Sequence, residues 1–159
     1  MTNLASGQSA VQEKAEGETT FQIRPFQQGD IRGLVALINT VDTAYNLDWG
    51  TSEDTFTRDL EGPRQEPERQ IIVAEAPGLE GIAAMGRVGY EHNAEKHERI
   101  FYLDVTVHPD MVGRGIEQAI ARHLLEIVHG YQNDPAMERM DNVIVKSYMR
   151  EELFHIREL

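Results

Sequence analysis

The sequence predicts an α/β fold, in which a mixed β-sheet has helices packed on its faces. Three observations lead to this class. Short runs of β-branched and aromatic residues alternate with amphipathic segments, so both strands and helices are expected. Turn residues at positions 77–81 separate two strand patterns, which predicts an antiparallel hairpin. A strand–helix–strand pattern follows in the second half and predicts parallel pairing within the same sheet.

The first 20 residues are predicted to form a disordered tail ahead of one domain at residues 21–159. Leu4 and Val11 are the only larger apolar side chains in this stretch. Such a segment cannot bury enough surface to offset the entropy lost on ordering. The domain is expected to begin with a short strand at 21–26.

Two helices are predicted after that strand. Asp30 is the expected N-cap of the first, because apolar residues recur behind it at helical spacing as far as about Thr40. Ser52 is the expected N-cap of a second, shorter helix that ends at Leu60. Residues 61–70 contain two prolines and are predicted to be a polar loop.

Three strands come next. The hairpin pairs residues 71–76 with residues 82–90, and the glycines at positions 86 and 89 suggest a bulge or a close approach by another backbone. Residues 99–107 form the strongest strand pattern in the chain, and Pro109 ends it.

The second half is predicted to close with a helix, a strand and a helix. The first of these helices begins near Ile116, and Gly130 is its expected C-cap. A strand is expected at 142–147 and a helical pattern at 150–159. The apolar stripe of the first helix comprises Ile116, Ala119, Ile120, Leu124, Ile127 and Val128.

The composition excludes several classes of protein. The chain has 159 residues, a formal net charge of −12 and no cysteine, so disulfides and thiolate zinc sites are ruled out. It lacks both a run of about 18 apolar residues and a signal-peptide pattern. We therefore expect a cytoplasmic protein that binds neither nucleic acid nor an anionic membrane surface. A partner that carries an amine suits the acidic charge.

The segment at 105–117 carries the clearest chemical signal. A strong strand ends there, a loop with Gly113, Arg114 and Gly115 follows, and an amphipathic helix begins. This order presents backbone N–H groups and the positive end of a helix dipole to one point. A phosphate or diphosphate could bind there. An ordinary tight turn is the alternative interpretation.

The string LDVTVHPDMVGRGIEQAIARHLL resembles the acyl-CoA-binding motif of the GNAT superfamily of N-acetyltransferases. The predicted order of elements across 21–159 is similar to that family as well. The resemblance implies acetyl-CoA as co-substrate and the primary amine of an unknown small molecule or peptide as acceptor. The backbone of Val105, Thr106 and Val107 would hold the pantetheine arm. The diphosphate would lie on the segment formed by Val112, Gly113, Arg114, Gly115, Ile116 and Glu117.

The sequence departs from the family pattern within that segment. Val112 stands where the family has Arg or Gln, and Glu117 stands where it has a small residue. A carboxylate in the first turn favours the helix but repels a diphosphate at the same N–H groups. The chain also ends at Leu159, where family members continue into two further strands. These departures imply an alternative function, a catalytically degenerate domain with a structural or interaction role. The degenerate half of a tandem protein, or a subunit whose homodimer partner completes the sheet, would fit it.

Catalytic roles follow from the same resemblance, which implies a general base and a tyrosine acid. Asp104 is the candidate base because it lies in mid-strand, in phase with Tyr102 and Thr106; a solvent-facing polar position is the alternative. Tyr148, after the last predicted strand, is the candidate acid.

Other polar and aromatic residues give weaker signals. The six histidines show no zinc-ligand spacing, so no metal site is expected. Tyr45 and Trp49 are candidates to line an acceptor pocket, or else ordinary core aromatics.

Overall fold

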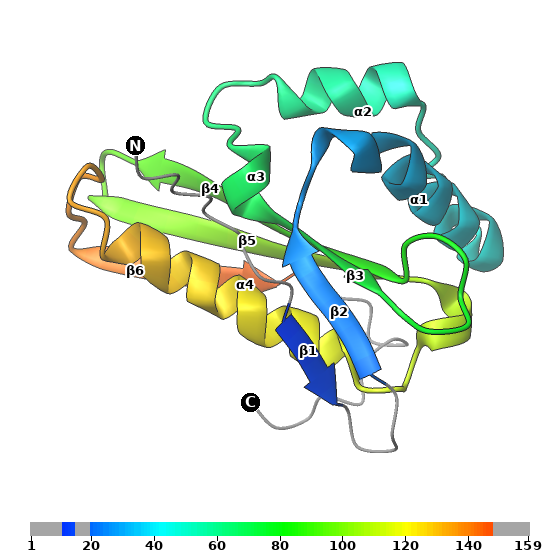
Figure 1. The fold of residues 1–159 in the computed structure, drawn as a ribbon. Coiled ribbons are helices and arrows are strands. Elements are labelled where there is room, and N and C mark those ends of the chain that lie inside the picture. Colours follow the sequence, from blue (N-terminus) through cyan, green and yellow to red (C-terminus); the bar gives the residue numbers. More distant parts are fainter. Residues whose placement is uncertain (1–10, 15–19, 148–159) are drawn as a thin grey trace, which may run out of the picture.

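The computed structural model describes residues 11–14 and 20–147 and contains one six-stranded sheet in the order β1-β2-β3-β4-β5-β6 (Figure 1). Its strands are β1 (Val11–Lys14), β2 (Thr20–Pro25), β3 (Ile71–Glu75), β4 (Ala84–Asn93), β5 (Glu98–Val107) and β6 (Asn142–Ser147).

Four α-helices and two short 3-10 turns, η1 and η2, connect the strands of the described chain. The helices are α1 (Ile31–Tyr45), α2 (Glu53–Leu60), α3 (Pro67–Gln70) and α4 (Ile116–Gln132), and the turns are η1 (Gln28–Asp30) and η2 (Pro109–Met111).

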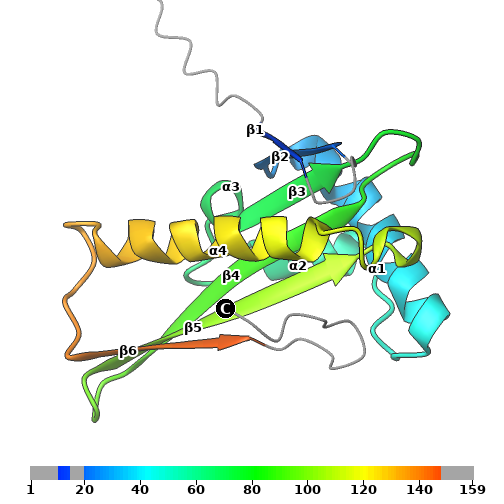
Figure 2. The ribbon, with the colours of Figure 1, turned by 90° about the horizontal axis from the view of Figure 1, so that it is seen from below.

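The pairing confirms the predicted mixed sheet. Neighbours from β1 to β5 are antiparallel, whereas β5 and β6 are parallel. The β4–β5 hairpin runs without a bulge from Ala84 opposite Val107 to Asn93 opposite Glu98. Figures 1 and 2 show α4 on one face of this sheet and α1 and α2 on the other.

Each face of the sheet has its own apolar core. On the α4 side, the helix stripe packs on alternate residues of β4 and β5, including Val88 and Phe101. On the other side, α1 and α2 bury Leu34 and Phe56 against Val73 of the central strand β3. Alternate strand residues therefore face different helices, and the side chains on the α1–α2 face of β5 are Tyr102, Asp104 and Thr106.

Several predicted boundaries differ from the structure. Residues Val11–Lys14, expected to be part of a disordered tail, form β1 and pair with β2. Helix α1 continues past Thr40 to Tyr45, and Asn46 ends it in the left-handed conformation with φ of 52°. Part of the predicted loop at 61–70 is the short helix α3.

The predicted C-cap at Gly130 is wrong, because α4 extends to Gln132 and Asn133 caps it. Packing explains the extension. Tyr131 is fully buried, lies against Tyr90 and Phe101, and donates a hydrogen bond from its hydroxyl to Glu66 Oε2 at 2.6 Å. These contacts hold the last turn of the helix on the sheet and outweigh the glycine signal.

Two predictions fall outside the described residues: the final helical pattern at 150–159 and the candidate acid Tyr148. None of the described helices combines the length and hydropathy of a membrane span.

Candidate active site

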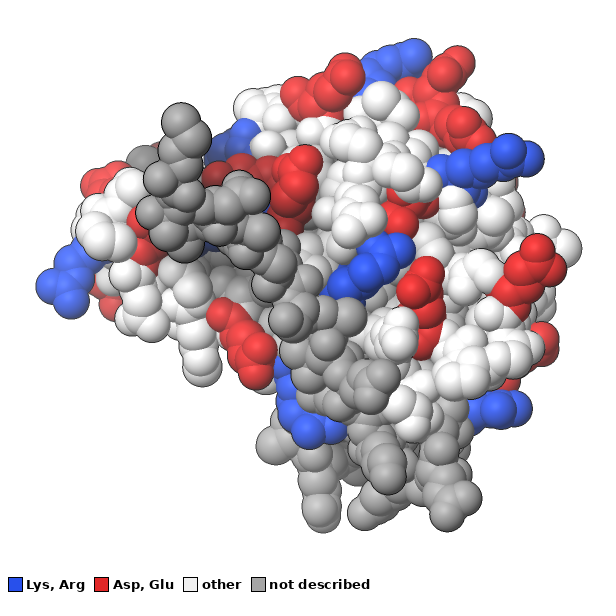
Figure 3. Space-filling view, viewed as in Figure 1, with Lys and Arg blue, Asp and Glu red and all other residues white. Residues whose placement is uncertain are grey.

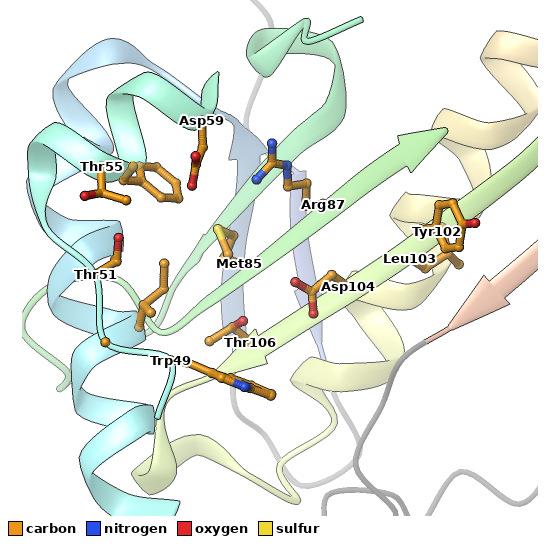
Figure 4. A pocket seen from close by; sticks show the side chains of 13 residues that line it. Trp49, Thr51, Thr55, Asp59, Met85, Arg87, Tyr102, Leu103, Asp104 and Thr106 are labelled. Carbon is orange, nitrogen blue, oxygen red and sulfur yellow. The ribbon is translucent and has the colours of Figure 1, made fainter. Parts of the chain in front are cut away.

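A cavity of about 650 Å³ opens on the α1–α2 face of the sheet (Figure 4). Its floor is formed by β4 and β5, and its walls by α2 and the loop between α1 and α2. Apolar side chains such as Phe56 and Met85 line part of it, and Asp59, Arg87 and Asp104 provide its charges. Ligand sites typically combine an apolar lining with a few converging polar groups in this way.

The loop that forms one wall is fixed to α1 by side-chain hydrogen bonds. Asp42 Oδ1 accepts from the backbone N–H of Trp49 at 2.7 Å. Asn39 makes two bonds to the backbone of Thr51, one to its N–H at 2.8 Å and one to its carbonyl at 3.0 Å. These contacts hold the Trp49 ring at the pocket, where it is 56% exposed. Tyr45, the other aromatic candidate, packs against the core instead.

Asp104 lies in this pocket, on the face of β5 that the strand period predicted. Its side chain is exposed to solvent at the pocket. Partial desolvation raises the pKa of Asp104 above its ordinary value of 3.8, while the charge of Arg87 and a backbone N–H from Val105 oppose that rise. A carboxylate with a raised pKa is better suited to accept a proton near neutral pH.

Arg87 stands opposite Asp104 on the adjacent strand β4. Its guanidinium donates a hydrogen bond to Gln65 Oε1 at 2.6 Å. Gln65 itself lies in a loop that buried Gln70 ties down through bonds to Glu66 N and Arg64 O. Burial lowers the pKa of Arg87, and the charges of Asp104 and Asp59 counteract that effect.

Over the residues that the structure describes, β5 has an open edge beside the pocket. Its pairing with β6 runs only from Glu98 opposite Asn142 to Leu103 opposite Ser147. Within the described chain, the segment from Asp104 to Val107 therefore has a strand partner on its β4 side alone. The end of β5 leads into the loop that precedes α4 (Figure 2).

The loop before α4 contains two glycines in a left-handed conformation. Gly113 and Gly115 have positive φ angles of 77° and 86°, which favour glycine. Gly115 is the N-cap of α4, and Arg114 is exposed. The side chain of Val112 packs against the core, and Ile116 is fully buried, so these two residues present only backbone to the loop surface.

Glu117 occupies this loop with its own side chain. Its Oε1 accepts a hydrogen bond from the N–H of Gly113 at 2.9 Å, and the residue is only 6% exposed. The carboxylate thus takes one of the N–H groups that a diphosphate would need and places a negative charge beside the others. An extended pantetheine arm would need unpaired backbone groups such as those of the described open edge, and a diphosphate would need Glu117 to leave Gly113.

The sequence located some of these residues and missed others. It identified Asp104, Trp49 and the loop around Gly113, but it gave no role to Arg87, Asp59 or Gln65. An arginine between Gly86 and Val88 in an otherwise apolar strand is a signal that could have indicated Arg87. Among the described residues, no group of three or more His, Asp or Glu side chains is arranged to hold a metal ion.

Comparisons with known proteins bear on the fold. No protein-family model matches the sequence, and no curated protein matches it significantly. Several solved structures do match the fold of this chain. A GCN5-related N-acetyltransferase from Sphaerobacter thermophilus superposes with a TM-score of 0.64 at 21% identity, over 82% of this chain. This chain spans 38% of the length of that protein.

Two further structures have a length closer to that of this chain. Glucosamine-6-phosphate N-acetyltransferase from Arabidopsis thaliana has a TM-score of 0.57 at 20% identity, over 84% of each chain. An aminoglycoside N-acetyltransferase in complex with CoA has a TM-score of 0.53 at 13% identity, over 84% of this chain and 80% of the other. The chain therefore has the fold of the GNAT superfamily, as its motif and element order predicted. The fold alone does not define an activity.

Proposed function

We propose that this protein is an acyltransferase that moves an acetyl group from acetyl-CoA to a primary amine. The observation that carries the proposal is the position of Asp104. This carboxylate lines the pocket directly beside the open edge of β5, where an acyl thioester could lie along the strand. The GNAT fold supports the same reaction class.

In the proposed reaction the acceptor amine enters the pocket and attacks the thioester carbonyl carbon. Asp104 takes a proton from the amine, directly or through a water molecule, since only the neutral amine is nucleophilic. The backbone of Val105, Thr106 and Val107 holds the pantetheine arm and orients the carbonyl. CoA leaves as a thiolate that then takes up a proton, and we assign this protonation to Tyr148.

The hydrogen bond between Glu117 and Gly113 favours a second candidate function. If Glu117 stays in place, its carboxylate keeps the N–H of Gly113 and repels a diphosphate, and the domain is a degenerate GNAT-like unit with a structural or interaction role. A charge-assisted hydrogen bond contributes about 1.5–3 kcal/mol. Displacing Glu117 should therefore weaken CoA binding by about 10- to 100-fold.

Calorimetric titration with acetyl-CoA separates the two functions. The transferase predicts saturable binding to the wild-type chain with a Kd of about 1 mM or below. It also predicts that Asp104→Asn keeps this binding and loses acetyl transfer, which is measured as release of free CoA thiol in the presence of amines. No heat with folded wild-type protein would exclude the transferase.

Substitutions in the loop before α4 test the second candidate function, the degenerate domain. The double variant Val112→Arg, Glu117→Gly restores the family residues and should gain CoA binding if the backbone cradle is intact. Glu126→Gln is a matched control, because Glu126 is an exposed acid further along α4. Binding by the double variant alone would assign the natural chain to the degenerate class. No binding by either protein would show that the loop geometry is unsuitable.

A further inference from the structure

Arg87 is a charged residue of the pocket to which the proposed reaction gives no role. Its guanidinium carries five N–H donors, and its bond to Gln65 is the one side-chain hydrogen bond it makes to the described protein. No carboxylate oxygen of the described chain lies within 4.0 Å of it. The residue is half-buried and lines the pocket. A cation in this position can bind an oxyanion from a ligand.

We infer that the acceptor is an amine that also carries a carboxylate, as an amino acid does, with the carboxylate on Arg87 and the amine beside Asp104. The inference rests on the proposed function only in calling this ligand an acceptor. Binding of such a molecule to the pocket does not depend on acetyl transfer.

The strand register supports this pairing of charges. Arg87 and Asp104 are direct cross-strand partners. Such residues have Cβ atoms about 4.5–5.5 Å apart. The Arg87 cation and the Asp104 anion are therefore fixed side by side on the sheet. They complement the carboxylate and the ammonium of an amino acid, which are only a few bonds apart. Phe56, Met85 and Trp49 provide apolar contact for the rest of such a molecule.

Two other ligand classes fit the charges less well. Asp59 points toward Arg87 from α2, so two carboxylates flank this arginine (Figure 4). They would repel a doubly charged phosphate more than a singly charged carboxylate. A diamine would place its second ammonium near the Arg87 cation. The planar guanidinium also matches a carboxylate through two parallel hydrogen bonds.

Calorimetry with matched ligand pairs tests the inference. The pairs are L-phenylalanine with phenethylamine, and L-lysine with cadaverine; the members of each pair differ only by the carboxylate. Each ligand is titrated at neutral pH, up to about 10 mM, with and without CoA. The wild-type protein should bind at least one amino acid about 10-fold or more tightly than its amine.

Variants of Arg87 locate the effect. Arg87→Met should lower the affinity for that amino acid by about 10- to 100-fold and should not lower the affinity for the matched amine, because an ammonium is repelled by the Arg87 cation. Arg87→Lys should keep only part of the preference, since lysine lacks the planar fork. Arg32→Met removes an exposed arginine from α1, outside the pocket, and should bind like the wild type.

Three outcomes would overturn the inference: equal binding of both members of each pair, tighter binding of the amines, or no binding of either amino acid. If Arg87→Met does not fold, the inference is decided by whether the wild-type protein binds an amino acid more tightly than the matched amine. Amino-acid binding without acetyl-CoA binding would keep this inference and remove the proposed transferase. Acetyl-CoA binding together with tighter binding of cadaverine than of L-lysine would keep the proposed transferase and remove this inference.

Discussion

At the scale of single residues, Asp104 has properties that favour chemistry over stability. Its pKa is raised because protein atoms displace solvent around the carboxylate. The folded chain therefore holds the Asp104 proton more tightly than the unfolded chain does. The ionised carboxylate costs stability above the folded pKa, and this cost disappears as the pH falls toward 3.8.

Asp104→Asn should accordingly be more stable than the wild type at pH 7. The expected gain is under about 1 kcal/mol, because the side chain is open to solvent on the pocket side. Urea unfolding at pH 7 and at pH 4 measures the difference, which should be smaller at the lower pH. Loss of stability at pH 7 would mean that the attraction of Arg87 outweighs desolvation.

Asp30 shows the opposite behaviour at the start of α1. Burial alone would raise its pKa, but two hydrogen bonds from Arg24, each 2.8 Å, and one from the N–H of Gln27 outweigh burial and hold the pKa below 3.8. The ionised form therefore stabilises the fold above pH 3.8, and this contribution is lost as the pH falls through the lowered value.

We expect Asp30→Asn to lower the free energy of unfolding by about 1–3 kcal/mol at pH 7. The difference in free energy of unfolding between the variant and the wild type should disappear only below pH 3.8. Glu75→Gln is the matched control, since Glu75 contacts the same arginine at 3.6 Å but its side chain is 46% exposed, against 10% for Asp30. Its cost should be below about 0.5 kcal/mol. Equal costs for the two variants would contradict the role of the Arg24–Asp30 pair.

At the scale of elements, the packing of α4 on β4 depends on Gly86. A Cβ at this position would lie 2.6 Å from Ile120 Cγ2, 2.9 Å from Leu124 Cδ2 and 3.0 Å from Ile72 Cγ1. The sequence predicted a bulge or a close approach by another backbone at Gly86 and Gly89, and this prediction is wrong: the β4–β5 register continues through both glycines, and the atoms close to Gly86 belong to side chains. Gly89, on the same strand, has open space where a Cβ would stand, with no atom within 4 Å.

Gly86→Ala should therefore destabilise the protein by about 1–3 kcal/mol, through overpacking between α4 and the sheet. Gly89→Ala should be neutral or slightly stabilising, since alanine loses less backbone entropy in a strand. Thermal unfolding of both variants tests this. A tolerated Gly86→Ala would show that Ile120 and Leu124 can move aside without cost.

Local signals in the sequence were enough for most elements. Ser52 does cap α2, its side chain accepting from the N–H of Thr55 at 3.2 Å. The strand at 142–147 has the predicted bounds, because its β-branched run has clear polar flanks. The residues that were missed depend on non-local contacts. Strand β1 exists through pairing with β2, and the opposition of Arg87 to Asp104 requires the register of the whole β4–β5 hairpin.

The orientation of Glu117 could not be predicted for a similar reason. The sequence allowed its carboxylate to swing outward or to cover the loop. The observed hydrogen bond to Gly113 depends on the path of the loop between η2 and α4, where two glycines have positive φ. That path is set by packing of Met111 and Ile116 in the core, not by the motif alone.

At the scale of the whole molecule, net charge is the dominant electrostatic feature. The chain carries a formal charge of −12. Acidic side chains are distributed widely over the face seen in Figure 3, with fewer basic ones between them. Like charges at these separations repel one another and destabilise the folded state. Added salt should relieve this repulsion, because the Debye length falls from about 30 Å at 0.01 M to about 8 Å at 0.15 M.

We therefore expect the Tm to rise by about 2–4 °C, about 1 kcal/mol of stability, between about 0.01 M and about 0.15 M sodium chloride at pH 7. Calorimetry measures this shift. Choline chloride should give the same shift as sodium chloride, since screening depends on ionic strength and not on the identity of the cation. A sodium-specific increase would indicate cation binding instead. A fall in Tm would mean that attractive pairs such as Arg69–Asp134, 2.9 Å apart, outweigh the repulsion across the surface.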